Sequence, residues 1–228
     1  MKRNTKSKKS TAVKKKPVVR KTSTSSTQTN KPTKNTTAAQ QEMRIAIAKD
    51  VLKQLNAKKI IAASGTWITD SKMPDLDEYV CDLQNKGERK FDVKNYVNKV
   101  NQCEVCALGS LFVSAVNLYN NVYISTDKNS NPQDQVWNIF TNLSSSPLKR
   151  YFSVAQLKYI EAAYEGLAGE HIPADERSEK YAEAFYLAHS NNNERLRGIM
   201  QNIIDNNGTF KPETSLVGSK LDSLVMNL

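Results

Sequence analysis

Two of the three cysteines in this 228-residue chain, Cys103 and Cys106, are spaced as Cys-x-x-Cys at the start of its most apolar segment, Asn101 to Tyr119. Thiolates at this spacing can bind zinc, form a redox-active pair, or supply a nucleophile from the start of a helix. Each chemistry needs further groups: more metal ligands, a preceding strand, or a base. The alternative is a structural role, in a buried helix where each cysteine packs as a small apolar side chain.

A zinc site would have to draw ligands from scattered positions, because the sequence has no second Cys-x-x-Cys and no His-x-x-x-His. The third cysteine, Cys81, could join Cys103 and Cys106. One of the two histidines, His171 or His189, would then complete a tetrahedral set. We favour the structural role for these cysteines, and we therefore expect no metal ion and no cofactor.

A nucleophilic Cys106 would gain acidity from the dipole of the helix that follows it. The base would have to be His171, in a loop, or His189, at the end of a helix. A redox pair of the thioredoxin kind needs a strand before the Cys-x-x-Cys, and residues 95–102 have no clear strand pattern. We therefore expect no catalytic residue, and a cysteine-dependent enzyme built on Cys106 and His171 is the alternative hypothesis.

The segment that carries the cysteine pair predicts a helix over residues 104–119. Almost its whole circumference is apolar or small, so it belongs at the centre of a domain. Gly109 lowers helix stability by about 1 kcal/mol relative to Ala, and the usual reason for such a glycine is close approach of another backbone. We expect a second helix to cross there. One stripe consists of Leu108, Leu111, Phe112, Ala115 and Tyr119, and the other of Cys103, Cys106, Ser110 and Val113.

Other helices are predicted from apolar residues at helical spacing and from capping residues. Ser153 and Gln156 form a capping box, and Asn191 and Glu194 have the same spacing. Glycines at 166 and 208 are expected to end the helices that these caps begin. Further helices are expected at residues 38–55, near 76–84, at 92–100 and at 175–188.

The fold class that follows is mainly α, a compact multi-helix domain with room for one short extended segment. Residues 58–70 combine β-branched side chains with Gly65 and supply that segment. The two tryptophans, Trp67 and Trp137, are interpreted as core anchors. We place the helical domain at residues 37–212 and expect a partly ordered C-terminal tail at 213–228.

The first 36 residues are predicted to be a disordered, Lys-rich arm. Residues 1–35 contain twelve Lys or Arg and no Asp or Glu, with too few apolar residues to form a core. Removing these twelve from the 33 basic residues of the chain leaves 21 against 23 acidic residues, so the rest of the chain is nearly neutral. A flexible, positively charged arm can bind phosphates. Because it has no aromatic residues on which bases could stack, we expect it to bind without reading the base sequence. The candidate nucleic-acid-binding residues are Lys2, Arg3, Lys6, Lys8, Lys9, Lys14, Lys15, Lys16, Arg20 and Lys21.

The expected location is the cytoplasm. No apolar run approaches the roughly 18 to 20 residues of a membrane span, and the basic start is not followed by the apolar region of a signal peptide. Three cysteines without a signal peptide fit a reducing compartment. We therefore expect no membrane partner.

Two phrases of the sequence, "CEVCALGSLF" and "NNERLRGIMQNIIDNNGTFKP", resemble parts of uncharacterised proteins of bacteria and their phages. In one such family a helix and a Gly-Trp or Gly-Tyr turn precede a Cys-Ala-Leu-Gly-Ala-Leu helix. Here Ser110 stands in place of the second alanine, and the similarity extends over residues 42–211. The resemblance implies a phage or bacterial origin. The expected location is then the cytoplasm of a bacterial host cell, and association with a virion is left open. It implies no catalytic residue.

Two hypotheses of different classes result. The first is a non-enzymatic accessory or structural protein, phage-encoded, whose helical body binds a protein partner or assembles with itself while its arm binds nucleic acid or another acidic surface. The second is a cysteine-dependent enzyme or zinc-binding protein centred on Cys103 and Cys106. The sequence has no glycine-rich phosphate loop, no His-Glu-x-x-His, no Gly-x-Ser-x-Gly and no dense aspartate cluster suited to calcium.

Overall fold

The computed structural model describes residues 34–70, 72–100, 102–119, 122–169, 171–215 and 220–227. These residues belong to one compact unit, Thr33–Leu228. The first helix begins at Lys34, so the helical body starts slightly before the predicted boundary at residue 37. The rest of the predicted arm lies outside the described residues, and its disorder stays a prediction.

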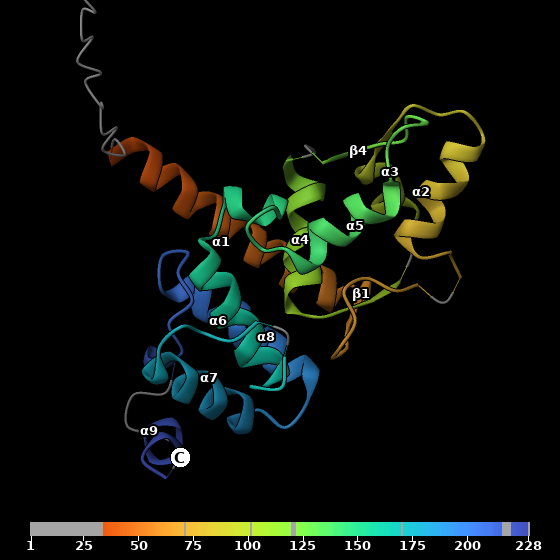
Figure 1. Ribbon diagram of the computed structural model, residues 1–228. Coiled ribbons are helices and arrows are strands. Elements are labelled where there is room, and N and C mark those ends of the chain that lie inside the picture. Colours follow the sequence, from red (N-terminus) through yellow and green to blue (C-terminus); the bar gives the residue numbers. More distant parts are fainter. Residues whose placement is uncertain are drawn as a thin grey trace, which may run out of the picture. The chain divides into compact units, whose positions relative to one another are not determined.

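The described chain is mainly helical, which confirms the predicted fold class. Figure 1 shows α4 between two groups of helices, α6 to α8 on one side and α2, α3 and α5 on the other. No helix among the described residues is long and apolar enough to cross a bilayer. The α-helices are α1 (Lys34–Asn56), α2 (Leu76–Asn85), α3 (Val93–Lys99), α4 (Ala107–Tyr119), α5 (Pro132–Thr141), α6 (Val154–Glu165), α7 (Glu176–Ala188), α8 (Asn192–Asp205) and α9 (Lys220–Val225), with 3-10 turns at Pro147–Arg150 and Pro212–Thr214.

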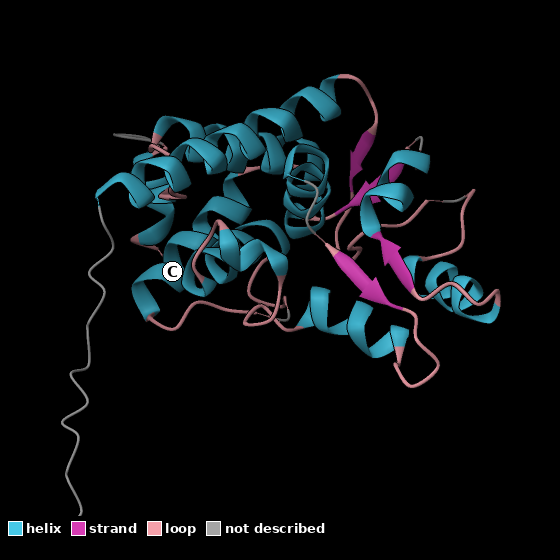
Figure 2. Cartoon of the chain, turned by 90° about the horizontal axis from the view of Figure 1, so that it is seen from above, coloured by secondary structure: helices cyan, strands magenta, loops and turns pink. Residues whose placement is uncertain are grey.

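Four short strands form two separate pairs in the described chain (Figure 2). β1 (Ile60–Ala62) runs parallel to β3 (Cys103–Val105), and β2 (Lys90–Asp92) runs antiparallel to β4 (Tyr123–Ser125). The extended segment predicted after the first helix is β1. The other three strands were not predicted. Each has three residues, too few for an alternating pattern, and none has an adjacent β-branched pair like Ile60 and Ile61 of β1.

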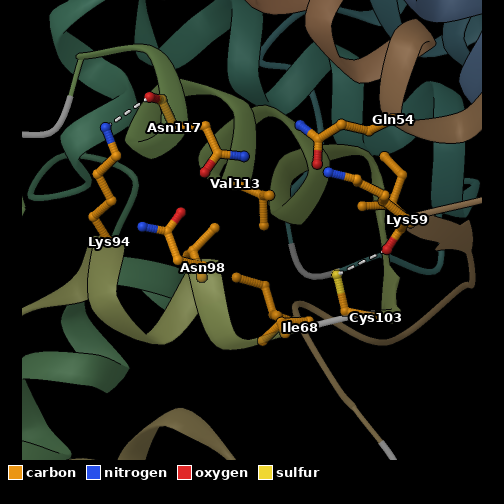
Figure 3. A pocket seen from close by; sticks show the side chains of 11 residues that line it. Gln54, Lys59, Ile68, Lys94, Asn98, Cys103, Val113 and Asn117 are labelled. Atoms are coloured by element: carbon orange, nitrogen blue, oxygen red, sulfur yellow. Dashed lines mark hydrogen bonds between the residues drawn. The ribbon is translucent and has the colours of Figure 1, made fainter. Parts of the chain in front are cut away.

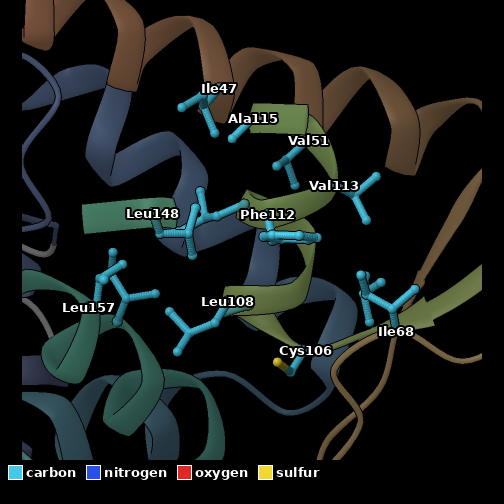
Figure 4. Close-up of a cluster of buried hydrophobic side chains, with 14 of the residues drawn as sticks. Ile47, Val51, Ile68, Cys106, Leu108, Phe112, Val113, Ala115, Leu148 and Leu157 are labelled. Atoms are coloured by element: carbon cyan, nitrogen blue, oxygen red, sulfur yellow. The ribbon is translucent and has the colours of Figure 1, made fainter. Parts of the chain in front are cut away.

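The core is built around α4, in which every residue from Ala107 to Val116 is buried. This helix packs against α1, α3 and α6. Figure 4 shows Phe112 and Leu108 of α4 among apolar side chains from α1 and α6, including Val51 and Leu157. The position predicted for this helix, at the centre of the domain, is therefore confirmed.

The caps predicted at Ser153 and Asn191 are present, with one difference in how the first is made. Ser153 Oγ accepts a hydrogen bond from the Gln156 backbone N–H at 3.2 Å. The Gln156 side chain does not return to Ser153; it donates to the Phe210 carbonyl at 3.2 Å and accepts from the Phe210 N–H at 2.7 Å. This half of the predicted capping box is therefore wrong, because the glutamine is used to bind a segment 54 residues away.

The helix predicted over residues 104–119 is wrong at its start. Cys103 lies on β3, and α4 begins only at Ala107. Glu104, in the middle of β3, exchanges backbone hydrogen bonds with Thr69, while the strand as a whole pairs with β1. Backbone partners on both sides therefore hold this stretch extended, and Cys103 does not share a helical stripe with Cys106.

The neighbour of Gly109 is also different from the prediction. A Cβ placed on Gly109 would lie 1.7 Å from the Trp67 carbonyl oxygen. The close approach of a backbone is confirmed, but the backbone belongs to the loop after β1 and not to a crossing helix. Trp137 was wrongly interpreted as a core anchor, because it is 67% exposed.

The C-terminal region contains the turn at Pro212–Thr214 and the helix α9, which packs against α7. Residues 216–219 and 228 of the predicted tail lie outside the described residues.

Candidate functional site

Cys106 occupies the turn between β3 and α4 and acts as the N-cap of that helix. Its N–H donates to the Thr66 carbonyl at 2.6 Å, and its carbonyl accepts from the Ser110 N–H at 2.9 Å. Its Sγ accepts from the Gly109 N–H at 3.4 Å. A side chain that accepts from the third residue of a helix is the normal arrangement of an N-cap, here made by a thiol.

Burial raises the pKa of the Cys106 thiol to about 12, and the nearby carboxylates of Glu165 and Glu161 act in the same direction. Burial, with the charge of Asp70, likewise raises the pKa of Cys103 to about 12. Because the thiolate is the reactive form, both cysteines are almost entirely protonated and unreactive at neutral pH. The hydrogen bond from the helix start does not offset the loss of solvation.

The two histidines do not supply a base to Cys106. His189 follows α7, where its Nδ1 lies 2.8 Å from the Phe185 carbonyl oxygen and its ring packs on the Phe185 ring at 4.2 Å between centroids. His171 lies in the loop before α7, and its Nε2 is buried without a hydrogen-bond partner in the described structure. Neither histidine lines the cavity next to Cys106.

That cavity has a volume of about 510 Å³ and lies between the loop after β1 and the end of α6. Both carboxylate oxygens of Glu165 lie 3.1 Å from the Gly65 nitrogen, whose N–H they accept. Burial raises the pKa of Glu165. The carboxylate thus joins the loop to α6. The cavity is thus lined by a protonated thiol and by two carboxylates, those of Glu161 and Glu165, of which Glu165 accepts the Gly65 N–H.

The cysteines are also not assembled as a metal site. Cys81 lies on α2 and is half-buried, whereas Cys103 and Cys106 are buried. Among the residues that the structure describes, no three His, Cys, Asp or Glu residues are grouped so that they could hold a metal ion. The set predicted for the zinc alternative is therefore not brought together.

Cys103 forms part of the wall of a second pocket, of about 340 Å³ (Figure 3). Lys59 and Lys94 lie on opposite sides of it in Figure 3. The Lys94 ammonium donates to the Asn117 carbonyl at 3.0 Å, at the end of α4. Cys103 Sγ lies 4.0 Å from the Lys59 carbonyl oxygen. The lining residues are Gln54, Lys59, Ile60, Ile68, Lys94, Val97, Asn98, Val100, Cys103, Val113 and Asn117.

This second pocket is lined by amide and ammonium side chains and by the Cys103 thiol, whose pKa burial raises to about 12. Gln54 is fixed by hydrogen bonds to Asp50 Oδ2 at 2.6 Å and to Ser114 Oγ at 2.9 Å. Its lining residues come from positions 54 to 117, without a common motif. Of the residues that line this pocket, only Cys103 was identified as a candidate from the sequence.

The predicted nucleic-acid-binding residues, Lys2 to Lys21, lie outside the described residues. Neither Cys103 nor Cys106 lies in a site whose chemistry indicates a class of protein. No protein-family model, curated protein or solved structure matches it. The resemblance to bacterial and phage proteins therefore stays a prediction.

Thiol labelling distinguishes buried cysteines from reactive ones. We expect the half-buried Cys81 to react first with Ellman's reagent at pH 7.5 and the other two thiols to react only as the chain unfolds. Mass spectrometry of the labelled peptides identifies the sites, and a Cys81→Ser variant should lose the fast phase. Faster labelling of Cys106 than of Cys81 would restore the cysteine-enzyme hypothesis.

Alkaline pH should destabilise the folded chain through the same two thiols. The ordinary pKa of a thiol is about 8.5, whereas burial raises both to about 12 in the folded chain. The unfolded chain therefore loses these protons first, and the free energy of unfolding should fall as pH rises above about 9. Urea unfolding at pH 7, 8, 9 and 10 measures it.

A Cys103→Ala, Cys106→Ala double variant should show a shallower fall between pH 9 and 10. The buried tyrosines, Tyr96 and Tyr164 among them, also have raised pKa values, and they remain in the variant as the source of the residual slope. Equal slopes in the two proteins would show that the thiols are not buried as described.

Proposed function

We propose that the protein is a non-enzymatic accessory protein that binds nucleic acid through its basic N-terminal segment, while its helical body binds a protein partner or another copy. The observation that carries the proposal is the division of charge. Residues 1–35 contain twelve basic and no acidic residues, and the rest of the chain contains 21 basic and 23 acidic residues. Such a separation concentrates phosphate affinity in one segment.

The cysteine-dependent alternative has less support. Its nucleophile would be a thiol with a pKa raised to about 12, and its base would be a histidine that does not line the same cavity. Both are conditions under which thiol catalysis fails at neutral pH.

The proposed mode of binding is electrostatic. Lys and Arg side chains that contact phosphates release condensed counterions, which supplies affinity independent of base sequence. The segment has no aromatic residues on which bases could stack. The proposal therefore places the protein where nucleic acid is handled, in the cytoplasm of a host cell or within a virion.

The test is a fluorescence-anisotropy titration of the full chain with labelled duplexes of equal length and unrelated sequence. We expect affinities equal within about threefold at one salt concentration, because phosphate contacts carry no base information. A preference of a hundredfold or more for one sequence would contradict the proposal.

A further inference from the structure

A third cavity, of about 450 Å³, is bounded by residues 65–69, the start of α2 and the helix α5. Both tryptophans of the chain, Trp67 and Trp137, line it. Ile68, Leu76 and Val136 also line it, and all three are buried. The volume lies in the range of small-molecule sites in proteins. We call it the tryptophan cavity.

Trp137 is unusual because it combines a large aromatic surface with 67% exposure. Its helix, α5, buries Val136 and leaves the indole toward solvent. Trp and Tyr side chains exposed next to an apolar depression are typical of binding sites, where one partner removes the aromatic surface from water.

The charge of the cavity has a single sign. Asp75, Asp77 and Asp134 line it, and no Lys or Arg among the described residues does. Within the described residues, none of the three carboxylates forms a salt bridge. The ion pair found there joins Lys180 and Glu176. Asp75 makes no side-chain capping hydrogen bond, whereas Asp134 accepts from the Asn131 amide at 2.8 Å.

Helix dipoles explain part of this pattern. Asp77 and Asp134 lie in the first turns of α2 and α5, where negative charge stabilises a helix. The dipoles do not require that both helices direct these residues at one cavity, that its described lining has no basic residue, or that Trp137 remains exposed. These three features together describe the surroundings of a bound cation.

We propose that the tryptophan cavity binds an organic cation, an alkylammonium or guanidinium group with an apolar stem. The face of an indole ring attracts such a cation more strongly than any other aromatic side chain does. The stem would pack against the buried apolar residues of the lining, Ile68, Leu76 and Val136, and the carboxylates add a negative potential. The proposal is independent of nucleic-acid binding by the N-terminal segment.

Intrinsic fluorescence tests the proposal directly, because both tryptophans line the cavity. The full chain is titrated with choline and, as a neutral molecule of the same shape, with 3,3-dimethyl-1-butanol, at ionic strength matched by sodium chloride. We expect a saturable change in emission with choline and binding of the neutral molecule that is at least fivefold weaker. Equal responses to the two molecules would overturn the proposal.

The cation can be a free molecule or a side chain of a basic peptide, and two further probes distinguish these sources. Agmatine carries one free guanidinium group, and an octapeptide of sequence KKKPVVRK, that of residues 14–21, carries several cationic side chains. Saturable binding of agmatine identifies a small-molecule site, and binding of the peptide alone identifies a site for basic segments. Binding of neither probe nor choline would overturn the proposal.

Variants locate the site. Asp77→Asn and Trp137→Ala should each weaken choline binding about five- to tenfold, measured by calorimetry so that loss of a fluorophore does not matter. Asp82→Asn is the matched control, because Asp82 is an exposed residue of the same helix outside the cavity. Thermal unfolding confirms that each variant is folded. Equal loss in the Asp77 and Asp82 variants would show that general charge, and not this cavity, attracts the cation.

Discussion

Deletion of residues 1–33 should abolish the binding of duplex DNA and leave a folded helical domain. The deleted segment carries eleven of the twelve basic residues that precede position 36 and no acidic residue. The described core lies in the unit from Thr33 to Leu228, so the deletion removes no buried side chain of that core. Helix content, measured by circular dichroism, should therefore be retained.

The intact chain should bind DNA with a strong dependence on salt. If about six basic side chains contact phosphates, log K should fall against log salt with a slope near −5. Anisotropy titrations at four salt concentrations between about 50 and 200 mM determine the slope. A truncated domain that binds as tightly as the intact chain, or an intact chain that does not bind at low salt, would contradict the proposed function.

A charge-matched pair of variants separates the segment from the general charge of the protein. Replacement of Lys14, Lys15 and Lys16 by Gln should reduce the magnitude of the slope by about 2 to 3 if all three contact phosphates. Replacement of Lys49, Lys53 and Lys86, which are exposed on the body, removes the same charge and should leave the slope nearly unchanged. Equal effects would assign the binding to net charge alone.

Gly109→Ala should destabilise the folded chain by more than about 3 kcal/mol, and Gly109→Leu should prevent folding. The added Cβ would lie 1.7 Å from the Trp67 carbonyl oxygen and 2.8 Å from its carbon. These are backbone atoms of a segment that hydrogen bonds hold on both sides, from Cys106 N–H to Thr66 at 2.6 Å and between Thr69 and Glu104. The segment cannot move away without breaking those bonds.

Gly198→Ala is the matched control, because Gly198 is also inside a helix. There the added Cβ would meet the side chains of His189, at 2.7 Å, and Phe185, at 3.1 Å, and no backbone atom among the nearest three. Side chains can adjust, and Ala recovers up to about 1 kcal/mol of helix propensity. Guanidinium unfolding should therefore show a loss below about 2 kcal/mol. A Gly109→Ala protein as stable as its parent would show that the loop does not contact α4 as described.

The helices and their ends were largely predictable because they depend on neighbours in sequence. Asn191 accepts from the Glu194 N–H at 3.0 Å, and Gly166 and Gly208 have positive φ, as the spacing indicated. Gln156 is an exception, because the hydrogen-bond partner of its side chain is distant in the sequence. Its amide could bond to Ser153 or to the distant Phe210, and packing of the two segments selected the second.

The candidate sites were predictable only in part. Cys106 was correctly placed near the start of a helix, but its reactivity depends on how completely other segments remove it from water, which no local pattern records. Trp137 and the three aspartates of the tryptophan cavity come from elements about 60 residues apart, and their positions in sequence form no motif.

The amino-acid sequence was sufficient to establish the mainly helical fold class, the central position of α4 and the separation of charge between the N-terminal segment and the rest. These properties follow from periodicity and composition, which are set by residues close together in the chain. Tertiary structure decided the strand at Cys103, the loop that contacts Gly109, the burial of both thiols and the gathering of both tryptophans at one cavity. Each of these depends on contacts between segments that are distant in the sequence. The free energy of such a contact depends on both segments, so the sequence of one segment alone does not predict it.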